Sequence, residues 1–259
     1  MNFENKNIIL TGASSGIGFE LAKLLARENC KIALLARRKE ILDDLAKEIS
    51  SSSNKILPIK CDVTKKEEVE NSINKIKNDF GKIDLAILNA GTSFRASVDD
   101  FHSEDADETF AVNVMGIIYF VEFLLPDFKK DQNGIIAGVT SMADQRGFPK
   151  SGFYCASKAA ASKFLESLRI ELKDYNIKVI TIKPGFVRTP MTDKNEFYMP
   201  FLMEPDKAAN IIIKGLKKEK RVIQFPFITA VGSMLSKFIP NPVFDYFAKK
   251  HLDRLNKQD

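Results

Sequence analysis

The chain has 259 residues, of which 44% are hydrophobic and 28% are charged, and its formal net charge is +5. These proportions are typical of a soluble globular protein and exclude a chain dominated by disorder. Because the lysines are scattered among acidic residues and form no basic stripe with interleaved aromatic residues, we expect no nucleic-acid partner.

Six short apolar runs predict strands, at residues 7–10, 31–36, 56–63, 84–91, 134–141 and 178–185. Most are continuous in hydrophobicity, as expected for strands buried on both faces of a parallel sheet. Helix-length segments lie between them, and RVIQFPF, ended by Pro226, predicts a further strand. The pattern therefore predicts a single α/β domain over residues 1–259, a doubly wound parallel sheet (Rossmann fold) of about seven strands flanked by helices.

The predicted helices carry apolar stripes with a period of 3.6 residues. The stripe of the first helix consists of Ile17, Leu21, Leu24 and Leu25. The stripe of the fourth consists of Phe110, Val114, Ile117, Val121 and Leu124. Thr64 and Glu67 form a capping-box pattern, which predicts the start of the third helix.

The stretch TGASSGIG follows the first predicted strand and opens the first helix. Its glycines, Gly12, Gly16 and Gly18, permit a tight turn, close approach to a pyrophosphate and close contact between helix and strand. The free N–H groups at the start of the helix would bind the anion. The loop predicts a dinucleotide site, to which we also assign Ser14, Ser15 and Ile17.

The residues at the end of the second strand bear on which dinucleotide binds. An acidic residue about twenty positions after the glycines usually binds the ribose 2′-hydroxyl of NAD. Here Ala36 is followed by Arg37 and Arg38, and a guanidinium pairs with a 2′-phosphate. These residues favour NADP(H); the alternative is that ARRKE is only the solvated start of a helix.

The few cysteines and histidines exclude further classes of protein. Cys30, Cys61 and Cys155 are far apart and form no C-x-x-C motif, which fits a reducing compartment better than a disulfide framework. The two histidines lie near no cluster with metal-ligand spacing, so we expect no metal site. The first residues lack a secretory signal pattern, and we expect a cytoplasmic location.

The stretch FYCASKAA places Tyr154 and Lys158 on one face of a predicted helix, one turn apart. Alone, such a pair is usually a surface pair. Together with the glycine loop and the strand ends, it resembles the short-chain dehydrogenase/reductase family. The resemblance covers about residues 7–189, where TGASSGIG, CDV, NAG, VNVMG, Ser141, YCASK and PGFVRTP stand in the family's order.

The resemblance implies roles for four catalytic residues. Tyr154 would be the general acid–base, and Lys158 would favour its phenolate and hold the nicotinamide ribose. Ser141 would bind the substrate oxygen and stabilise negative charge there. Asn113 would hold a water that links Lys158 to solvent.

The resemblance also implies further contacts with the cofactor. Asp62 and Val63 would lie at the adenine, and Asn89, Ala90 and Gly91 against the cofactor. The segment beside the nicotinamide would contribute Pro184, Gly185, Val187 and Thr189, with Tyr154 and Lys158 completing the set. Thr189 would contact the carboxamide, or would instead cap the next segment.

Residues 190–205 fall where the family carries its mobile substrate lid, which we expect to be helical. This segment is apolar and rich in methionine, which suits an apolar ligand of adaptable shape, unless its side chains pack permanently onto the body. We assign the substrate contacts to Ser141, Met191, Phe197 and Met199.

The leading hypothesis for the function is an oxidoreductase that transfers hydride between NADP(H) and a carbonyl or secondary alcohol, in the direction of reduction of an apolar ketone or aldehyde. One alternative within this chemistry is a reductase of 3-oxoacyl or lipid ketones. The other is a non-catalytic NADP(H)-binding regulator on the same fold.

Residues 228–259 predict a helical C-terminal tail that is interrupted at IPNP. Ile228, Val231, Leu235 and Phe238 share its first apolar face, and Lys237, Lys249, Lys250 and Arg254 add positive charge. The tail is interpreted as a flap over the substrate pocket or the body, a dimer contact, or an anchor at an anionic membrane surface, and we favour the flap. The resemblance to this family, whose members commonly form oligomers, implies a homodimer or homotetramer.

Overall fold

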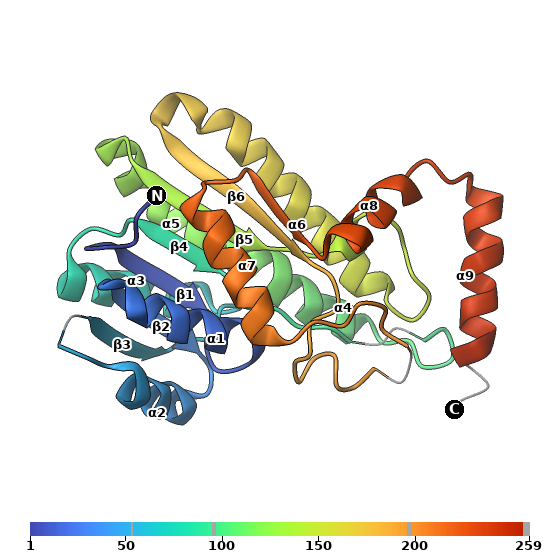
Figure 1. Ribbon diagram of the computed structural model, residues 1–259, viewed down its shortest axis with the longest axis horizontal. Coiled ribbons are helices and arrows are strands. Elements are labelled where there is room, and N and C mark those ends of the chain that lie inside the picture. The colour runs from blue at the N-terminus through green and yellow to red at the C-terminus, as the bar shows by residue number, and fades with distance from the viewer. Residues whose placement is uncertain (53, 95–96, 196–197, 256–259) are drawn as a thin grey trace.

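The computed structural model describes residues 1–52, 54–94, 97–195 and 198–255. Its centre is one parallel sheet of seven strands in the order β3-β2-β1-β4-β5-β6-β7, with helices on both faces (Figure 1). The strands are β1 (Asn7–Thr11), β2 (Lys31–Ala36), β3 (Lys55–Lys60), β4 (Leu85–Leu88), β5 (Gly134–Val139), β6 (Ile177–Pro184) and β7 (Val222–Phe225). The predicted doubly wound fold is confirmed.

The strand order reverses beside β1. In register, Ile9 of β1 lies between Ala33 of β2 and Ala86 of β4. From β1 the chain builds outward to β2 and β3, and then returns to add β4 on the other side. The loops after β1 and β4 therefore leave in opposite directions, which opens a crevice at the carboxyl ends of the strands.

Each face of the sheet has its own hydrophobic core because successive strand residues point to opposite faces. Ile8 and Leu10 belong to the first core, and Ile9 belongs to the second. The first is covered by α1 (Gly16–Leu25), α2 (Lys39–Ile49) and α7 (Pro205–Lys217). The second is covered by α3 (Lys66–Phe80), α5 (Gly116–Asp131) and α6 (Gly152–Glu171).

The fourth predicted helix is one continuous helical run, which starts as α4 (Ser103–Phe110) and widens into a π turn at Ala111–Met115 before α5. The run is long and apolar enough for a membrane span by length and composition, and 44% of its most apolar window is buried. Because its inner side supplies Ile117, Val121 and Leu124 to the second core, packing on the sheet accounts for its apolar composition.

The predicted stripes of the first and fourth helices are only partly buried. The π turn adds one residue to a helical turn and so changes the phase of the fourth helix's stripe. Phe110, which precedes the π turn, and Val114, which lies within it, are therefore half-buried. In α1, Leu21 and Leu25 are buried, whereas Ile17 and Leu24 are half-buried.

The capping box predicted for α3 is wrong. Thr64 donates its hydroxyl to Asp62 Oδ1 at 2.8 Å. Glu68, and not Glu67, reaches back across the loop, and its carboxylate accepts the backbone N–H of Asp62 at 2.8 Å. The helix then begins at Lys66 without a side-chain cap. The loop is held by the Asp62 side chain in place of the predicted box.

The expectation of a helical lid at residues 190–205 is also wrong for the part of this segment that the structure describes. Turns follow Thr189, and the next helix, α7, begins only at Pro205. The end of the segment pairs with residues that precede it, since Met203 donates its N–H to the Phe186 carbonyl and accepts from Arg188 N. Pairing at this end and three prolines, Pro190, Pro200 and Pro205, explain why no helix forms.

The tail forms α8 (Phe227–Ser236) and α9 (Asn241–Leu255), separated at Pro240 as predicted, and the two helices lie at one end of the molecule (Figure 1). The predicted apolar face of α8 is not buried, and Ala230 is the one buried residue of this helix.

All three cysteines are unpaired and buried. Burial raises the pKa of the Cys30 thiol to about 12 and that of Cys61 to about 11, and it also raises the pKa of Cys155. The thiols are therefore protonated at neutral pH and pack as small apolar groups.

Candidate active site

The site begins at the junction between the loops that follow β1 and β4. Asn89 donates its side-chain amide to the carbonyls of Thr11 and Gly12, at 3.1 and 3.3 Å. The Thr11 hydroxyl in turn accepts the backbone N–H groups of Asn89 and Ala90, at 2.9 and 3.0 Å. These bonds hold the two loops together at the point where the strand order reverses.

The close packing at this junction explains two of the predicted glycines. Gly12 has a φ of +66°, and a Cβ there would lie 2.9 Å from the Ala90 Cα. A Cβ on Gly18 would lie 2.2 Å from the Gly12 carbonyl oxygen. Only glycine fits these positions, so the first turn of α1 can lie directly against the loop.

Arg38 lies at the start of α1, where an anion site is predicted. Ser15 precedes the helix and does not cap it, which leaves the first backbone N–H groups of the helix available. Arg38 Nη2 instead donates to the hydroxyls of Ser14 and Ser15, at 2.9 and 3.0 Å. Arg37 lies farther out, with two thirds of its side chain exposed and Nη1 4.0 Å from the Glu108 carboxylate. Of the two arginines, Arg38 is therefore the one held at the glycine loop.

A cleft of about 500 Å³ runs along these loops and reaches α6. Of the residues predicted to bind a cofactor, those that line it are Gly12, Ser14, Ser15, Gly16, Ile17, Arg37, Arg38, Asp62, Val63, Asn89, Ala90, Gly91, Tyr154, Lys158, Pro184, Gly185, Val187 and Thr189. Gly18 does not line it, because it lies beneath the loop against Gly12. Thr189 caps no helix and instead forms a turn with Thr192, whose hydroxyl accepts the Thr189 N–H at 2.9 Å.

Tyr154 and Lys158 lie at the inner end of this cleft, one turn apart on α6 as predicted. Lys158 is 3% exposed, and its Nζ donates to the Val139 carbonyl at 3.1 Å and lies 5.7 Å from the centre of the Tyr154 ring. Ser141 follows β5, and its side chain lies close enough to Tyr154 to lower the pKa of the phenol. The Ser141 hydroxyl also accepts the N–H of Ala143 at 3.1 Å, which fixes its rotamer.

Burial shifts the pKa values of both groups toward their neutral forms. It raises the pKa of Tyr154, and the nearby Ser141 side chain opposes this shift only in part. Burial also lowers the pKa of Lys158 to about 8. The Lys158 ammonium is directed to the Val139 carbonyl, and the predicted stabilisation of the Tyr154 phenolate by Lys158 stays a prediction.

Asn113 lies in the π turn and is fully buried. Its side chain exchanges two hydrogen bonds with the backbone of Thr92, each of 2.9 Å, and donates a third to the Ser157 hydroxyl at 3.0 Å. Asn113 therefore clamps the loop after β4 to the helix that carries Lys158. A water held by this side chain would have to use the remaining lone pair of Oδ1, so its predicted role with water stays a prediction.

The predicted substrate residues lie at different places. Ser141 is beside Tyr154, and Met191 lines the cleft close to Thr189. Met199 is half-buried, and its sulfur accepts a weak bond from the Asn195 amide at 3.5 Å. Phe197 lies outside the described residues.

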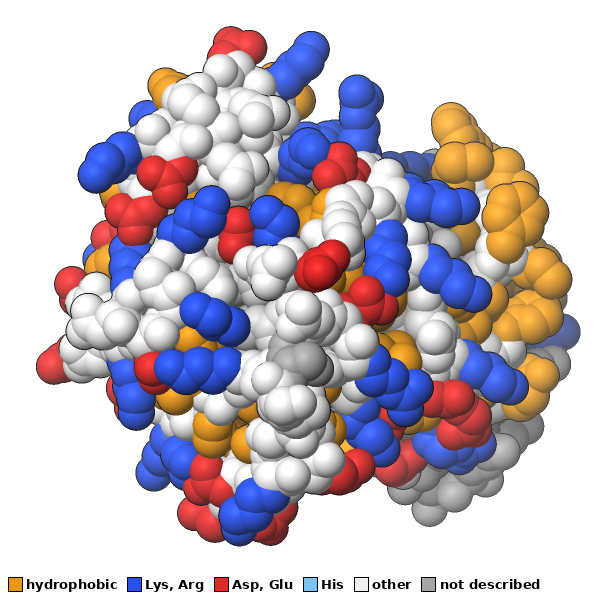
Figure 2. Space-filling view, turned by 60° about the vertical axis from the view of Figure 1, so that its left-hand side comes forward, with side chains coloured by type: hydrophobic (Ala, Val, Ile, Leu, Met, Phe, Trp, Pro, Cys, Tyr) orange, Lys and Arg blue, Asp and Glu red, His pale blue; other side chains and the backbone are white. Residues whose placement is uncertain are grey.

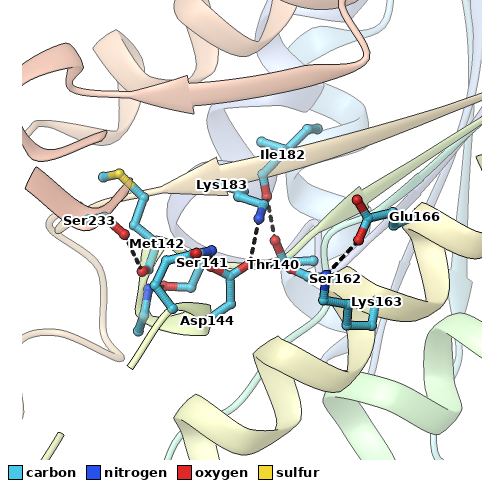
Figure 3. A network of polar contacts seen from close by, with 12 residues as sticks. Thr140, Ser141, Met142, Asp144, Ser162, Lys163, Glu166, Ile182, Lys183 and Ser233 are labelled. Carbon is cyan, nitrogen blue, oxygen red and sulfur yellow. Dashed lines mark hydrogen bonds and ion pairs between the residues drawn. The ribbon is translucent and has the colours of Figure 1, made fainter. Parts of the chain in front are cut away.

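A buried carboxylate, Asp144, supports the segment that carries Ser141 (Figure 3). Its side chain is 1% exposed and lies 2.6 Å from Lys183 Nζ of β6. It also accepts a hydrogen bond from the Ser162 hydroxyl of α6. Asp144 thus ties the turn after Ser141 to both the strand and the helix that border the cleft.

Comparison with known proteins decides the family. Residues 6–197 match the family model described as short chain dehydrogenase. The chain belongs to the short-chain dehydrogenase family. It is accordingly an oxidoreductase of the short-chain dehydrogenase type.

Relatives of this short-chain dehydrogenase match over most of its length. An uncharacterized oxidoreductase of Myxococcus xanthus is 34% identical, and the match covers 95% of this chain and 97% of the relative. A solved alcohol dehydrogenase of Thermococcus sibiricus complexed with 5-hydroxy-NADP is 28% identical, with a TM-score of 0.77 over 86% of this chain and 95% of that chain.

Two further solved structures are similar. A 3-ketoacyl-(acyl-carrier-protein) reductase of Brucella melitensis complexed with NADH is 26% identical, with a TM-score of 0.77, over 86% of this chain and 96% of that one. A short chain dehydrogenase/reductase of Burkholderia phymatum in complex with NAD is 21% identical, with a TM-score of 0.83, over 91% and 94% of the two chains, and it shows the fold alone.

Several residues at the cleft were missed by reasoning from the sequence. They are Ala36, Cys61, Thr92, Ser93, Val112, Val139, Thr140, Pro190, Thr192 and Lys194. The strand-end rule could have identified Thr92, Ser93 and Thr140, because each follows a strand that is predicted to end at the crevice. Nothing comparable marks Lys194, which reaches the cleft from the lid segment.

The first prediction concerns Asp144. Asp144→Asn keeps the shape of the side chain but leaves the Lys183 ammonium without its carboxylate, which should lower the free energy of unfolding by about 3 kcal/mol. Urea unfolding of the variant measures this change. The matched control is Asp174→Asn, at an exposed acid, which should change stability by less than about 0.5 kcal/mol. Equal stabilities for the two variants would contradict the role given to the Asp144 pair.

Proposed function

We propose that this short-chain dehydrogenase is an NADP(H)-dependent oxidoreductase that reduces an apolar ketone or aldehyde to an alcohol. The observation that carries the proposal is that Tyr154 and Lys158 line the cleft that begins at the glycine loop, with Ser141 beside Tyr154. The hydride would come from the bound nicotinamide cofactor.

The proton chemistry supports the direction of reduction. Because burial raises the pKa of Tyr154, its phenol is protonated at neutral pH and able to donate to a carbonyl oxygen. The Ser141 hydroxyl would donate to the same oxygen and stabilise the negative charge that develops there. Lys158, one turn away, would stabilise the phenolate that remains after the proton has left.

The preference for NADP(H) rests on this chain's own residues, since the solved relatives carry NAD, NADH or an NADP analogue. Ala36 ends β2 where an acid would bind the ribose hydroxyl of NAD, and Arg38 is held at the phosphate loop by Ser14 and Ser15. A guanidinium in this position favours the 2′-phosphate of NADP(H). It could not accept the hydrogen bond that a carboxylate accepts from the free ribose hydroxyl of NAD.

The lid segment supports an apolar substrate. Met191 lines the cleft, Met199 is half-buried, and Tyr198 and Phe201 are exposed at the same segment. Apolar side chains of several shapes suit a substrate that carries no charge in the part farthest from its carbonyl group. A 3-oxoacyl or lipid ketone is the second candidate, favoured by the likeness to the ketoacyl reductase of Brucella melitensis.

The proposed acid is tested by Tyr154→Phe, which removes the transferable proton and keeps the ring. We expect turnover of a panel of apolar ketones, followed by loss of NADPH, to fall at least about a hundredfold with unchanged melting temperature. Tyr246→Phe, at an exposed tyrosine, is the matched control and should keep full activity. Substantial activity in Tyr154→Phe would remove this residue from the mechanism.

The second test of the mechanism is its pH dependence. Lys158 carries its charge below its pKa of about 8 and loses the charge as the pH rises through this value. We expect kcat/KM for ketone reduction to fall as the pH rises above about 8, because the developing phenolate loses its cation. A profile that stays level through this range would contradict the proposed role of the ammonium.

The choice of cofactor is tested by Arg38→Asp. A carboxylate would repel the 2′-phosphate and accept a hydrogen bond from a free ribose hydroxyl, so the kcat/KM ratio of NADPH to NADH should fall at least about tenfold. Arg37→Asp is the matched variant and should change the ratio less, because Arg37 lies farther from the loop. A larger effect of Arg37→Asp would place the 2′-phosphate at that side chain instead.

A further inference from the structure

The tail presents an apolar surface that the rest of the chain does not cover. On α8 and just beyond it, Phe227 is 80% exposed and Phe238 is 79% exposed. The other exposed apolar residues of this surface are Ile228, Met234, Leu235, Ile239, Val243, Tyr246 and Phe247. Figure 2 shows hydrophobic side chains gathered along one edge of the molecule, at the end where α8 and α9 lie. We call these residues the tail surface.

The two helices are held to the body by their opposite faces. In α8, Ala230 is buried and Ser233 donates its hydroxyl to the Met142 carbonyl at 2.8 Å. In α9, the Phe244 ring packs over the Arg146 guanidinium, 3.9 Å from its centre. Arg146 also donates to the Ile239 carbonyl at 3.2 Å. The body is therefore contacted along a narrow inner face, and the predicted flap leaves its apolar stripe facing outward.

Positive charge accompanies the tail surface. Residues 227–255 contain four lysines and arginines but only two acidic residues. Lys237 lies beside Phe238, and Lys250 follows Tyr246 and Phe247 by one helical turn, which places it on the same side of α9. Within the part of the chain that the structure describes, neither lysine forms an ion pair, whereas Lys249 pairs with Asp253 at 3.1 Å.

We propose that α8 and α9 form a docking surface for an anionic lipid bilayer. A helix with large apolar side chains on its outer face and lysines beside them lies in the plane of a membrane, with the apolar face among the acyl chains and the ammonium groups at the headgroups. α8 has 10 residues, about 15 Å of helix, and is too short to span a bilayer. It would therefore lie on the membrane and not cross it.

Charge favours the bilayer over a second copy of the chain. In a two-fold dimer the same surface meets itself, so the unpaired lysines of both copies would be brought toward one another. An anionic bilayer accommodates both groups, with the apolar residues among the acyl chains and the lysines at the headgroups. Because Ser233 and Arg146 attach the tail to the segment that follows Ser141, the membrane-facing surface would adjoin the substrate side of the cleft.

The first experiment uses the absence of tryptophan from the chain. Phe238→Trp supplies one fluorescent reporter within the tail surface, and Ile170→Trp supplies a matched reporter at an exposed apolar residue of α6. With vesicles of phosphatidylglycerol and phosphatidylcholine in equal parts, we expect a blue shift and quenching by brominated lipid only for Phe238→Trp. Unchanged emission of Phe238→Trp in these vesicles would overturn the proposal.

The second experiment measures co-sedimentation with the same vesicles at low salt. The wild-type chain should pellet with them and remain in the supernatant with phosphatidylcholine alone. The double variant Leu235→Glu, Phe238→Glu and the double variant Lys237→Glu, Lys250→Glu should each bind at least about tenfold more weakly. Ile170→Glu and Lys130→Glu are matched controls at exposed positions outside the tail and should bind like the wild type.

Two outcomes of the co-sedimentation would overturn the proposal. One is that both double variants bind the vesicles as tightly as the wild-type chain does. The other is that the wild-type chain does not bind the vesicles. If, in that case, light scattering shows a dimer that Leu235→Glu, Phe238→Glu converts to a monomer, the tail surface is assigned to a second copy. Neither outcome depends on ketone reduction, so the membrane proposal and the proposed function are tested independently of one another.

Discussion

The arrangement of the cleft depends on the hydrogen bonds between the loops that follow β1 and β4. Asn89 binds the carbonyls of Thr11 and Gly12, and the Thr11 hydroxyl returns two bonds to the second loop. From this junction the chain of contacts continues through Thr92 to Asn113, and from there to Ser157, the neighbour of Lys158. The glycine loop and the helix that carries Lys158 are therefore joined by one polar network, in which Thr11, Asn113 and Ser157 are buried and Asn89 and Thr92 are half-buried. Its members rigidify one another because each is hydrogen-bonded.

Desolvation acts on the two titratable groups at the inner end of the cleft in opposite directions. Burial keeps a proton on the phenol of Tyr154 and weakens the hold of Lys158 on its own proton. Both shifts favour the neutral forms, which is the cheapest state for two groups withdrawn from water. Ser141 is the group that counters the shift at the phenol, and Asp144 holds the turn after Ser141 in place through Lys183 and Ser162.

Reasoning from the sequence was reliable where one residue pattern has one physical solution. Continuous apolar runs predicted the strands, and the glycines before the first helix predicted the tight loop between β1 and α1, because few other residues fit so close to Ala90 and Gly12. It was unreliable where the surroundings of a residue depend on segments that are distant in the sequence. Asp144 belongs to no motif, and its importance appears only when β6 and α6 bring Lys183 and Ser162 to it. The stripe of α8 shows that a face is apolar, but its burial depends on what else the fold places there.

The buried cysteines have a consequence for the reagents that such a site would meet. Aldehydes and unsaturated ketones are electrophiles, and they react with thiolates far more readily than with thiols. Cys61 borders the cleft and Cys155 follows Tyr154, yet both thiols are buried with raised pKa values, as is Cys30. Under the proposed function, a reactive carbonyl bound next to Tyr154 would meet no competing nucleophile in these protonated thiols, and the protein would be protected from inactivation by its own substrate.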